Sequence, residues 1–180
     1  GICEKLILIL ALLMYPSFNF SQVYHIDNEE DISRVILDNE YIVISKFKSD
    51  SGNFISTLGG YYQLNEGLYE INLEFNSNYD QDSIKSLSIV KTSKWKNISK
   101  ENNTLKGKWV MSGRYNNGEF RTRNTDLPRK TMKVLIDGFF QWIAFNTETF
   151  KFSGSGGGEY ETIEGKYIEI IQYFSRDDSR

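Results

Sequence analysis

Cysteine, histidine and proline are nearly absent from this sequence. The 180 residues include one cysteine, Cys3, one histidine, His25, and two prolines. A lone cysteine excludes disulfide bonds within the chain and zinc sites with several cysteine ligands. A Ser-His-Asp triad has only His25 to use, and this residue lies upstream of any serine-rich stretch. A carboxylate pair such as Glu161 and Glu169 is the remaining catalytic candidate, but chance pairs are common among many acids. We therefore expect no enzymatic activity.

An excess of basic residues is also missing. Lys and Arg total 21 and Asp and Glu total 24, which gives a net charge of −3. Proteins that bind nucleic acid neutralise phosphates with a basic surface, so we expect no nucleic-acid partner. His25 lies near Asp27, Glu29 and Glu30, where a metal site is conceivable, but a solvated polar segment is the favoured interpretation. No metal or cofactor is expected.

Only one long apolar run is present, from Leu6 to Met14. It is too short to span a bilayer as a helix, it follows Lys5, and Ser21 precedes Gln22 as a small residue suited to signal peptidase cleavage. These features predict a signal peptide over residues 1–21; a short buried helix is the alternative. The mature protein is then expected to begin at Gln22, to have no stable membrane span, and to be secreted or located in the periplasm or outer envelope.

Aromatic residues, in contrast, are abundant at 14%, which favours strands. The chain also repeats itself: residues 41–75 align without a gap on residues 139–173. The aligned pairs include Phe47 with Phe145, Gly59-Gly60 with Gly157-Gly158, and Glu66-Gly67 with Glu164-Gly165. Upstream, RVILDN from Arg34 matches KVLIDG from Lys133 if one residue is inserted.

Each copy is expected to be an antiparallel meander. The dipeptides Asp137-Gly138 and Glu164-Gly165 are turn signals, and the alternation from Tyr69 to Phe75 predicts a strand with one buried face. The glycine run from Gly154 to Gly158 lacks the Lys-Ser/Thr of a phosphate-binding loop, so we interpret it as a bend or bulge.

Two units follow from the repeat, over residues 22–103 and 104–180. No counterpart of the strand that begins at Gly107 is expected between Gln22 and Arg34. The second copy has no match to the strands that close the first copy, so we expect the second unit to be truncated and residues 168–174 to form an exposed edge strand.

The order of these motifs resembles a known family. Gly107-Lys108-Trp109 is similar to the Gly-x-Trp signature of lipocalin-like barrels, and the stretch from Arg129 to Arg180 resembles exported bacterial lipocalin-like proteins of unknown function, whose longer members carry two units in tandem. The resemblance implies an all-β, antiparallel up-and-down meander that forms a lipocalin-like barrel and binds small molecules. It also implies that Trp109 plugs the closed end of the barrel, although the basic residue that usually covers this tryptophan has no position here.

Glu169 is the residue that suggests a binding site. It takes the place of the apolar Ile71 of the first copy, between Tyr167 and Tyr173, and a carboxylate on an inward face needs a partner or water. It could contact a sugar or a cationic ligand; an internal salt bridge to Arg129 or Lys130 is the favoured alternative, and a bulge that turns it outward is a third. The complete set of candidate ligand-binding residues is Glu169, Tyr167, Tyr173, Trp142, Tyr160 and Arg129.

The expected function is the binding of a small, partly apolar molecule or glycan inside the barrel. The alternative is a structural or adhesive envelope module that contacts another protein. Exposed side chains of Trp95 or Trp142 would favour the alternative, and a pocket open to solvent would favour ligand binding.

Overall fold

The computed structural model describes residues 21–102 and 104–176, so the expected signal peptide, except for Ser21, lies outside the described residues. The chain is all-β with antiparallel sheets, as expected: 64% is strand and 3% is helix. Within residues 21–102 and 104–176 the helical element is a single turn, α2 (Tyr79–Asp82). No helix in the described part of the chain is long and apolar enough to cross a membrane.

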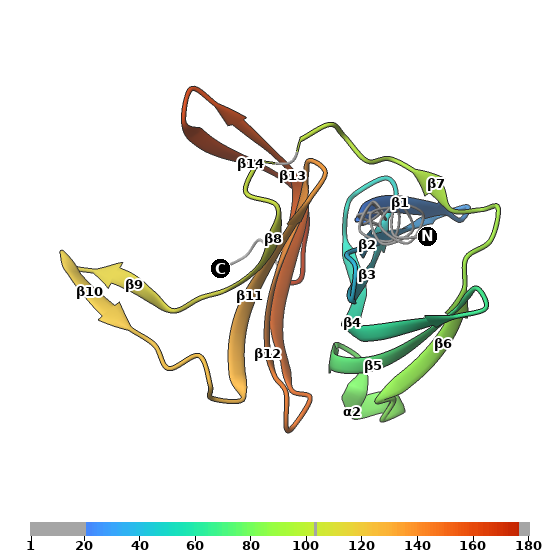
Figure 1. Ribbon diagram of the computed structural model, residues 1–180, viewed down its shortest axis with the longest axis horizontal. Coiled ribbons are helices and arrows are strands. Elements are labelled where there is room, and N and C mark those ends of the chain that lie inside the picture. Colours follow the sequence, from blue (N-terminus) through green and yellow to red (C-terminus); the bar gives the residue numbers. More distant parts are fainter. Residues whose placement is uncertain (1–20, 103, 177–180) are drawn as a thin grey trace, which may run out of the picture.

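Most of the N-terminal half forms a seven-stranded sheet in the order β6-β5-β4-β3-β2-β1-β7. Its strands are β1 (Gln22–Asp27), β2 (Asp31–Leu37), β3 (Tyr41–Lys48), β4 (Phe54–Asn65), β5 (Leu68–Asn76), β6 (Ser86–Val90) and β7 (Lys96–Asn97). The segment 91–95 runs from β6 at one edge to β7 at the other, so it crosses the concave outer face of this curled sheet (Figure 1).

The C-terminal half forms a five-stranded sheet in the order β14-β13-β12-β11-β8 and a separate hairpin. The sheet contains β8 (Gly107–Val110), β11 (Arg129–Ile136), β12 (Phe139–Asn146), β13 (Phe152–Ile163) and β14 (Lys166–Phe174). The hairpin consists of β9 (Gly113–Asn116) and β10 (Glu119–Thr122) and projects away from the sheet (Figure 1).

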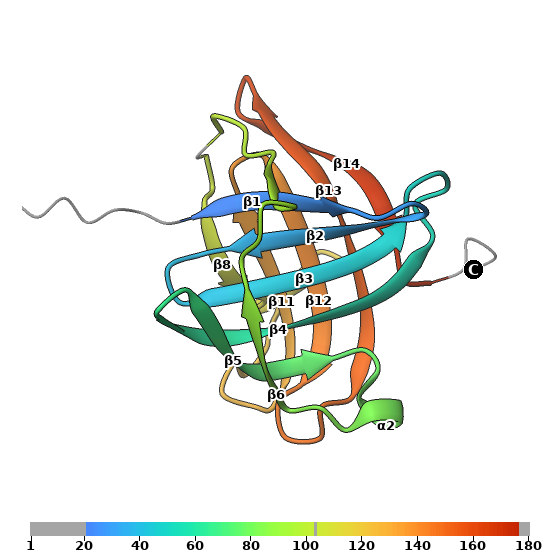
Figure 2. The same ribbon diagram turned by 90° about the vertical axis from the view of Figure 1, so that its right-hand side faces the viewer.

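The two larger sheets pack face to face with their strands crossing steeply (Figure 2). Both sheets have edges, and no closed barrel is found among the described residues. β14 is an edge strand, as expected, and apart from β13 its backbone pairing with the described residues is limited to an isolated bridge from Phe174 to Asn53. The architecture is therefore a two-layer sandwich, in which each sheet has an inner face toward the other sheet and an outer face.

The inner faces form one apolar core. It joins side chains of both sheets: Val23, Ile36, Tyr41, Val43 and Phe75 with Met132, Val134, Ile136, Phe139, Ile143 and Phe145. Burial of each such side chain contributes about 1.5–3 kcal/mol, so this layer is the main attachment between the sheets. Residues of both expected units contribute to it.

A small polar network lies inside this core. Gln141 of β12 donates to Thr57 Oγ1 at 2.9 Å and to Ser155 Oγ at 3.0 Å, and it accepts a hydrogen bond from Ser45 Oγ at 2.7 Å. All four side chains are buried. Because each finds partners within the network, the polar groups can lie in the core without a large desolvation penalty.

The ladders β2–β5 and β11–β14 have the same register at an offset of 98 residues (from 41 to 139). Bulges occur at matching places, after Lys46 and Ala144 and after Gly59 and Gly157. The glycine run is therefore a bulge, as predicted. At Gly158 a Cβ atom would lie 1.9 Å from the carbonyl oxygen of Ile170, so only glycine fits.

The upstream alignment of Arg34 with Lys133, which needs one inserted residue, is wrong. Asp38 pairs with Tyr41 as Ile136 pairs with Phe139, so the two hairpins have turns of equal length. The expectation that the strand beginning at Gly107 has no counterpart in the first unit is also wrong. Its counterpart is β1, which pairs with β2 as β8 pairs with β11. Sequence similarity could not show this, because β1 and β8 share a place in the ladder but almost no side chains.

Contacts between the sheets also come in matched pairs. Phe47 stacks on Tyr173 with ring centroids 4.7 Å apart, and the corresponding rings of Phe145 and Phe75 lie 5.1 Å apart. Phe54 and Phe152, which occupy equivalent positions, stack on each other at 5.9 Å. This is the contact pattern of a two-fold symmetric interface, made here within one chain.

Candidate functional site

The candidate residues from the sequence do not all meet. Trp142, Tyr160, Tyr167 and Glu169 share the outer face of the five-stranded sheet, as the β-ladder pairing requires. Tyr173 lies on the inner face, 2% exposed, and packs against Phe47. The bulge between Gly157 and Gly158 separates the two faces, because it adds one residue to β14 between Ile171 and Tyr173.

A row of opposed residues crosses this outer face from one edge to the other. Trp109 pairs with Lys133, Lys133 with Trp142, Trp142 with Gly156, and Gly156 with Phe174. Directly opposed residues in antiparallel strands project to the same face, so these side chains are neighbours. Gly156 leaves room for the rings of Trp142 and Phe174, whose centroids are 5.8 Å apart.

Trp109 does not plug a barrel. It is 54% exposed on the edge strand β8, and its indole N–H donates to the carbonyl oxygen of Leu105 at 2.9 Å. The expected plug requires a closed end of a barrel, and the five-stranded sheet is open on both edges. Trp109 instead forms one wall of a surface hollow.

This hollow, which we call the aromatic hollow, has a volume of about 350 Å³. Its lining includes Trp109, Val110, Met111, Lys133 and Trp142. The hollow is open to solvent, and its size falls in the range of small-molecule pockets. Apolar walls with one cationic side chain suit a partly apolar ligand that also carries an acceptor.

Glu169 is held by the protein itself. Lys133 forms an ion pair with Oε1 of Glu169, and the Tyr167 hydroxyl donates to the same oxygen at 2.7 Å. Burial, together with this hydrogen bond, raises the pKa of Tyr167. The internal salt bridge therefore forms, but with Lys133 rather than with the expected Arg129 or Lys130. Sequence spacing could not select Lys133, which lies on β11, three strands away from β14 across the sheet.

Tyr160 is a buried residue of the same outer face. It is 1% exposed, its hydroxyl donates to the carbonyl oxygen of Thr104 at 2.6 Å, and its ring lies 5.7 Å from that of Tyr167. Burial raises the pKa of the Tyr160 hydroxyl. Tyr160 is thus a structural residue of the face and has no access to a ligand.

The matching outer face of the seven-stranded sheet is covered. Its residue equivalent to Trp109 is Tyr24, which is opposed to Val35 as Trp109 is opposed to Lys133. Tyr24 is 3% exposed, because Trp95 from the crossing segment 91–95 packs on it at 5.5 Å and on Tyr69 at 6.2 Å. On the five-stranded sheet, Asn102 and Thr104 contact Tyr160, and Trp109 remains 54% exposed.

Comparisons with protein-family models, curated proteins and solved structures found no match. The geometry of the outer face is therefore the basis for any functional proposal.

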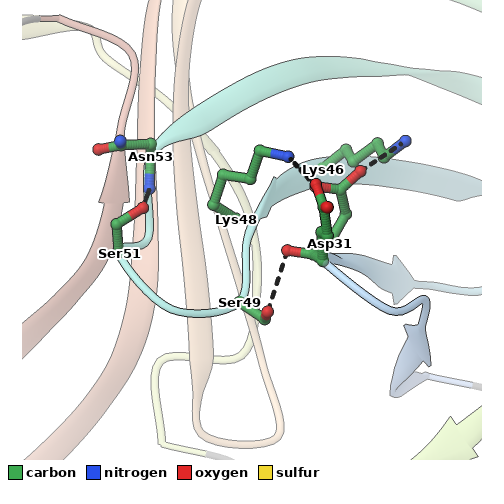
Figure 3. A network of polar contacts seen from close by, with 7 residues as sticks. Asp31, Lys46, Lys48, Ser49, Ser51 and Asn53 are labelled. Carbon is green, nitrogen blue, oxygen red and sulfur yellow. Dashed lines mark hydrogen bonds and ion pairs between the residues drawn. The ribbon is translucent and has the colours of Figure 1, made fainter.

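Two other polar clusters have structural roles. At the ends of β2 and β3, Asp31 forms ion pairs with Lys46 at 3.1 Å and Lys48 at 3.0 Å, beside the Ser49 hydroxyl, which donates to the Glu30 carbonyl oxygen (Figure 3). Hydrogen bonds from Lys48 and Lys46 lower the pKa of Asp31. Because the carboxylate is already engaged by two lysines, this cluster fixes the loop after β3 and offers no free acid.

The second cluster surrounds the only histidine. The expectation that His25 lies in a solvated polar segment is wrong. His25 lies on β1, where its Nε2 accepts a hydrogen bond from Nε of Arg34 at 2.9 Å. Within the described ranges, no group of three or more His, Cys, Asp or Glu side chains is placed to hold a metal ion.

The sequence interpretation missed Lys133 and three of the four arginines near the hairpin. Arg129 was a candidate, but Arg114, Arg121 and Arg123 were not. A signal was available: four of the seven arginines of an acidic chain fall between residues 114 and 129. Their convergence depends on how the hairpin is placed, which local sequence does not determine.

Proposed function

We propose that this protein is a non-catalytic binding module that holds a small, partly apolar molecule in the aromatic hollow on the outer face of the five-stranded sheet. One observation carries the proposal. In the seven-stranded sheet the rings of Tyr24 and Tyr69 hold the indole of Trp95, whereas at the equivalent positions of the five-stranded sheet Trp109 and Tyr167 are 54% and 38% exposed. The chain thus fills one copy of this face with its own aromatic ring and leaves the other open.

The chemistry of the ligand follows from the walls. A ligand ring that contacts Trp109 and Trp142 gains binding free energy of about 25 cal/mol for each Å² of apolar surface that it buries. Each aromatic contact adds about 0.5–1.5 kcal/mol. Lys133 replaces the Val35 of the covered face, and it lies between the two indoles in the ladder. A planar or sugar-like ring with an acceptor group near Lys133 satisfies both conditions.

The pairing register, the matched bulges and the matched ring contacts support a common origin of the two ladders as tandem lipocalin-like units. Export to the periplasm or beyond belongs to the same proposal and rests on the apolar run before Gln22. An open hollow and the partial burial of Trp95 and Trp142 favour ligand binding over adhesion through exposed tryptophans.

Binding of octyl glucoside, a sugar joined to an apolar chain, tests the proposal by isothermal titration calorimetry. We expect Trp109→Ala and Trp142→Ala each to weaken binding about tenfold, because each removes one wall of the hollow. The matched control is Phe120→Ala, which removes a ring of similar exposure (53%) on the hairpin outside the hollow. Equal losses in all three variants, or no binding at all, would reject the aromatic hollow as the site.

A second function is favoured by the edge strand. β14 exposes Ile168, Ile170 and Ile171, by 42%, 48% and 60%, beside unpaired backbone groups. Such an edge can add a strand from another protein, so an adhesive or structural role is the second candidate. Ile170→Lys should abolish any concentration-dependent association seen by light scattering; association that survives this change must use another surface.

A further inference from the structure

A second hollow, which we call the arginine hollow, adjoins the aromatic hollow. It has a volume of about 500 Å³ and lies between the hairpin β9–β10 and the start of β11. Four arginines line it: Arg114, Arg121, Arg123 and Arg129. Met111 and Thr131 line both hollows, so the two spaces meet along these residues.

The fold places these like-charged arginines close together. Arg114 and Arg121 are directly opposed in the hairpin, so their side chains project to the same face. Like charges in this position are destabilising. Arg123 is fixed at the base of the hairpin, where its Nη1 donates to Thr131 Oγ1 at 3.2 Å and its backbone N–H donates to Ser112 at 2.7 Å.

No acid of the described chain neutralises this group. The ion pairs found among residues 21–102 and 104–176 all use lysine, and none involves an arginine of the hollow. Glu119 is on the same face of the hairpin, but it is opposed to Asn116 and does not line the hollow. Four positive charges therefore converge on an open space in a protein whose net charge is −3.

We propose that the arginine hollow binds the anionic head of the same ligand whose apolar part occupies the aromatic hollow. This inference rests on the proposed function and specifies its substrate class: an amphiphile with one strongly anionic group of the phosphate, sulfate or carboxylate type. Guanidinium groups bind such oxygen anions in pairs of hydrogen bonds, and an anion between Arg114 and Arg121 removes the repulsion across the hairpin. The shared wall of Met111 and Thr131 places head and apolar part side by side.

Three probes separate the parts of this proposal in calorimetric titrations at low salt. Octyl phosphate carries both parts, octyl glucoside carries the apolar part with an uncharged head, and inorganic phosphate carries the anion alone. We expect octyl phosphate to bind at least tenfold more tightly than either of the others. Its affinity should fall as salt is added, because Arg114, Arg121 and Arg129 are exposed and their charges are screened.

Arg121→Gln and Arg129→Gln are the variants, since neither side chain makes a hydrogen bond or ion pair that would disturb folding. Each should weaken octyl phosphate binding about tenfold and leave octyl glucoside binding unchanged. Lys94→Gln is the control, because it removes one exposed positive charge from the loop between β6 and β7 of the other sheet.

The outcomes distinguish the two proposals. If octyl glucoside binds and responds to Trp109→Ala, but octyl phosphate binds no more tightly and ignores both arginine variants, the anionic head is rejected and the aromatic hollow stands. If Lys94→Gln weakens octyl phosphate as much as Arg121→Gln does, the attraction is only the general charge of the protein, and the arginine hollow is rejected. If neither alkyl probe binds, both proposals fall.

Discussion

The stability of this protein should fall between pH 7.5 and pH 5 because of a single histidine. His25 accepts a hydrogen bond through Nε2 from Arg34, so this nitrogen carries no proton in the folded state. Arg34 is 2% exposed, and its guanidinium lies 4.8 Å from the ring centre of Phe139. Burial and the Arg34 charge lower the pKa of His25 from 6.5 to about 4, against the opposite effect of Asp27 and Glu159.

The size of the effect follows from this difference in pKa. As the pH falls below 6.5, the unfolded chain takes up a proton at His25 and the folded chain does not, so the unfolded state gains stability. At pH 5 a pKa of about 4 in the folded state corresponds to a loss of about 2 kcal/mol. His25 is only partly buried, and solvent screening reduces the expected loss to about 1 kcal/mol.

Urea unfolding at several pH values between 7.5 and 5 measures this loss, with His25→Gln as the matched variant. The Gln amide oxygen can still accept from Arg34, but the side chain does not titrate. The folded-state pKa values of Asp27, Asp31 and Glu159 are lowered, so these carboxylates lose their stabilisation only below this window. Parallel pH dependence in the wild type and His25→Gln would refute the reasoning, as would a folded-state pKa of His25 near 6.5 measured by NMR.

Three further predictions concern the sheets. Gly158→Ala should lower the free energy of unfolding by about 1–3 kcal/mol or more in urea titrations, because its Cβ would lie 1.9 Å from the Ile170 carbonyl oxygen; Gly118→Ala, which meets no atom within 4 Å, should lose only about 1 kcal/mol from its positive φ. Amides of the edge strand β14 should exchange with deuterium faster than those of β5, which pairs on both sides, and equal protection would show that another strand covers β14. Glu169→Gln should lower stability by no more than about 1 kcal/mol in thermal melts, since the pair with Lys133 is partly exposed, whereas a loss of several kcal/mol would indicate a buried ion pair.

Local features of the sequence predicted the elements of this fold well. The alternation from Tyr69 to Phe75 is strand β5, and Glu66-Gly67 forms the turn before it with both residues at positive φ. The glycine pair at Gly157-Gly158 is a bulge. Each of these depends on side-chain periodicity or on backbone freedom within a few residues, which the sequence shows directly.

Long-range features were not predictable in the same way. Whether a meander closes into a barrel depends on tilt and stagger summed over all its strands, and here the strands form a sandwich with open edges instead. The exposure of Trp109 follows from that difference. The pairing of Glu169 with Lys133 depends on strands distant in sequence, so spacing alone could not identify it. The convergence of Arg121 with Arg129 depends on how the hairpin is placed against the start of β11, which local sequence does not determine.

The shared inner core has a consequence for biosynthesis. The strands β2–β5 are complete once Asn76 has been made, but their inner face, including Ile36 and Val43, is covered only by residues of the other sheet, whose last strand ends at Phe174. At about 5–20 residues per second the ribosome needs roughly 5–20 s to supply the missing half. During that interval the nascent chain presents an apolar sheet surface to its surroundings, and the inner core can form only late in synthesis.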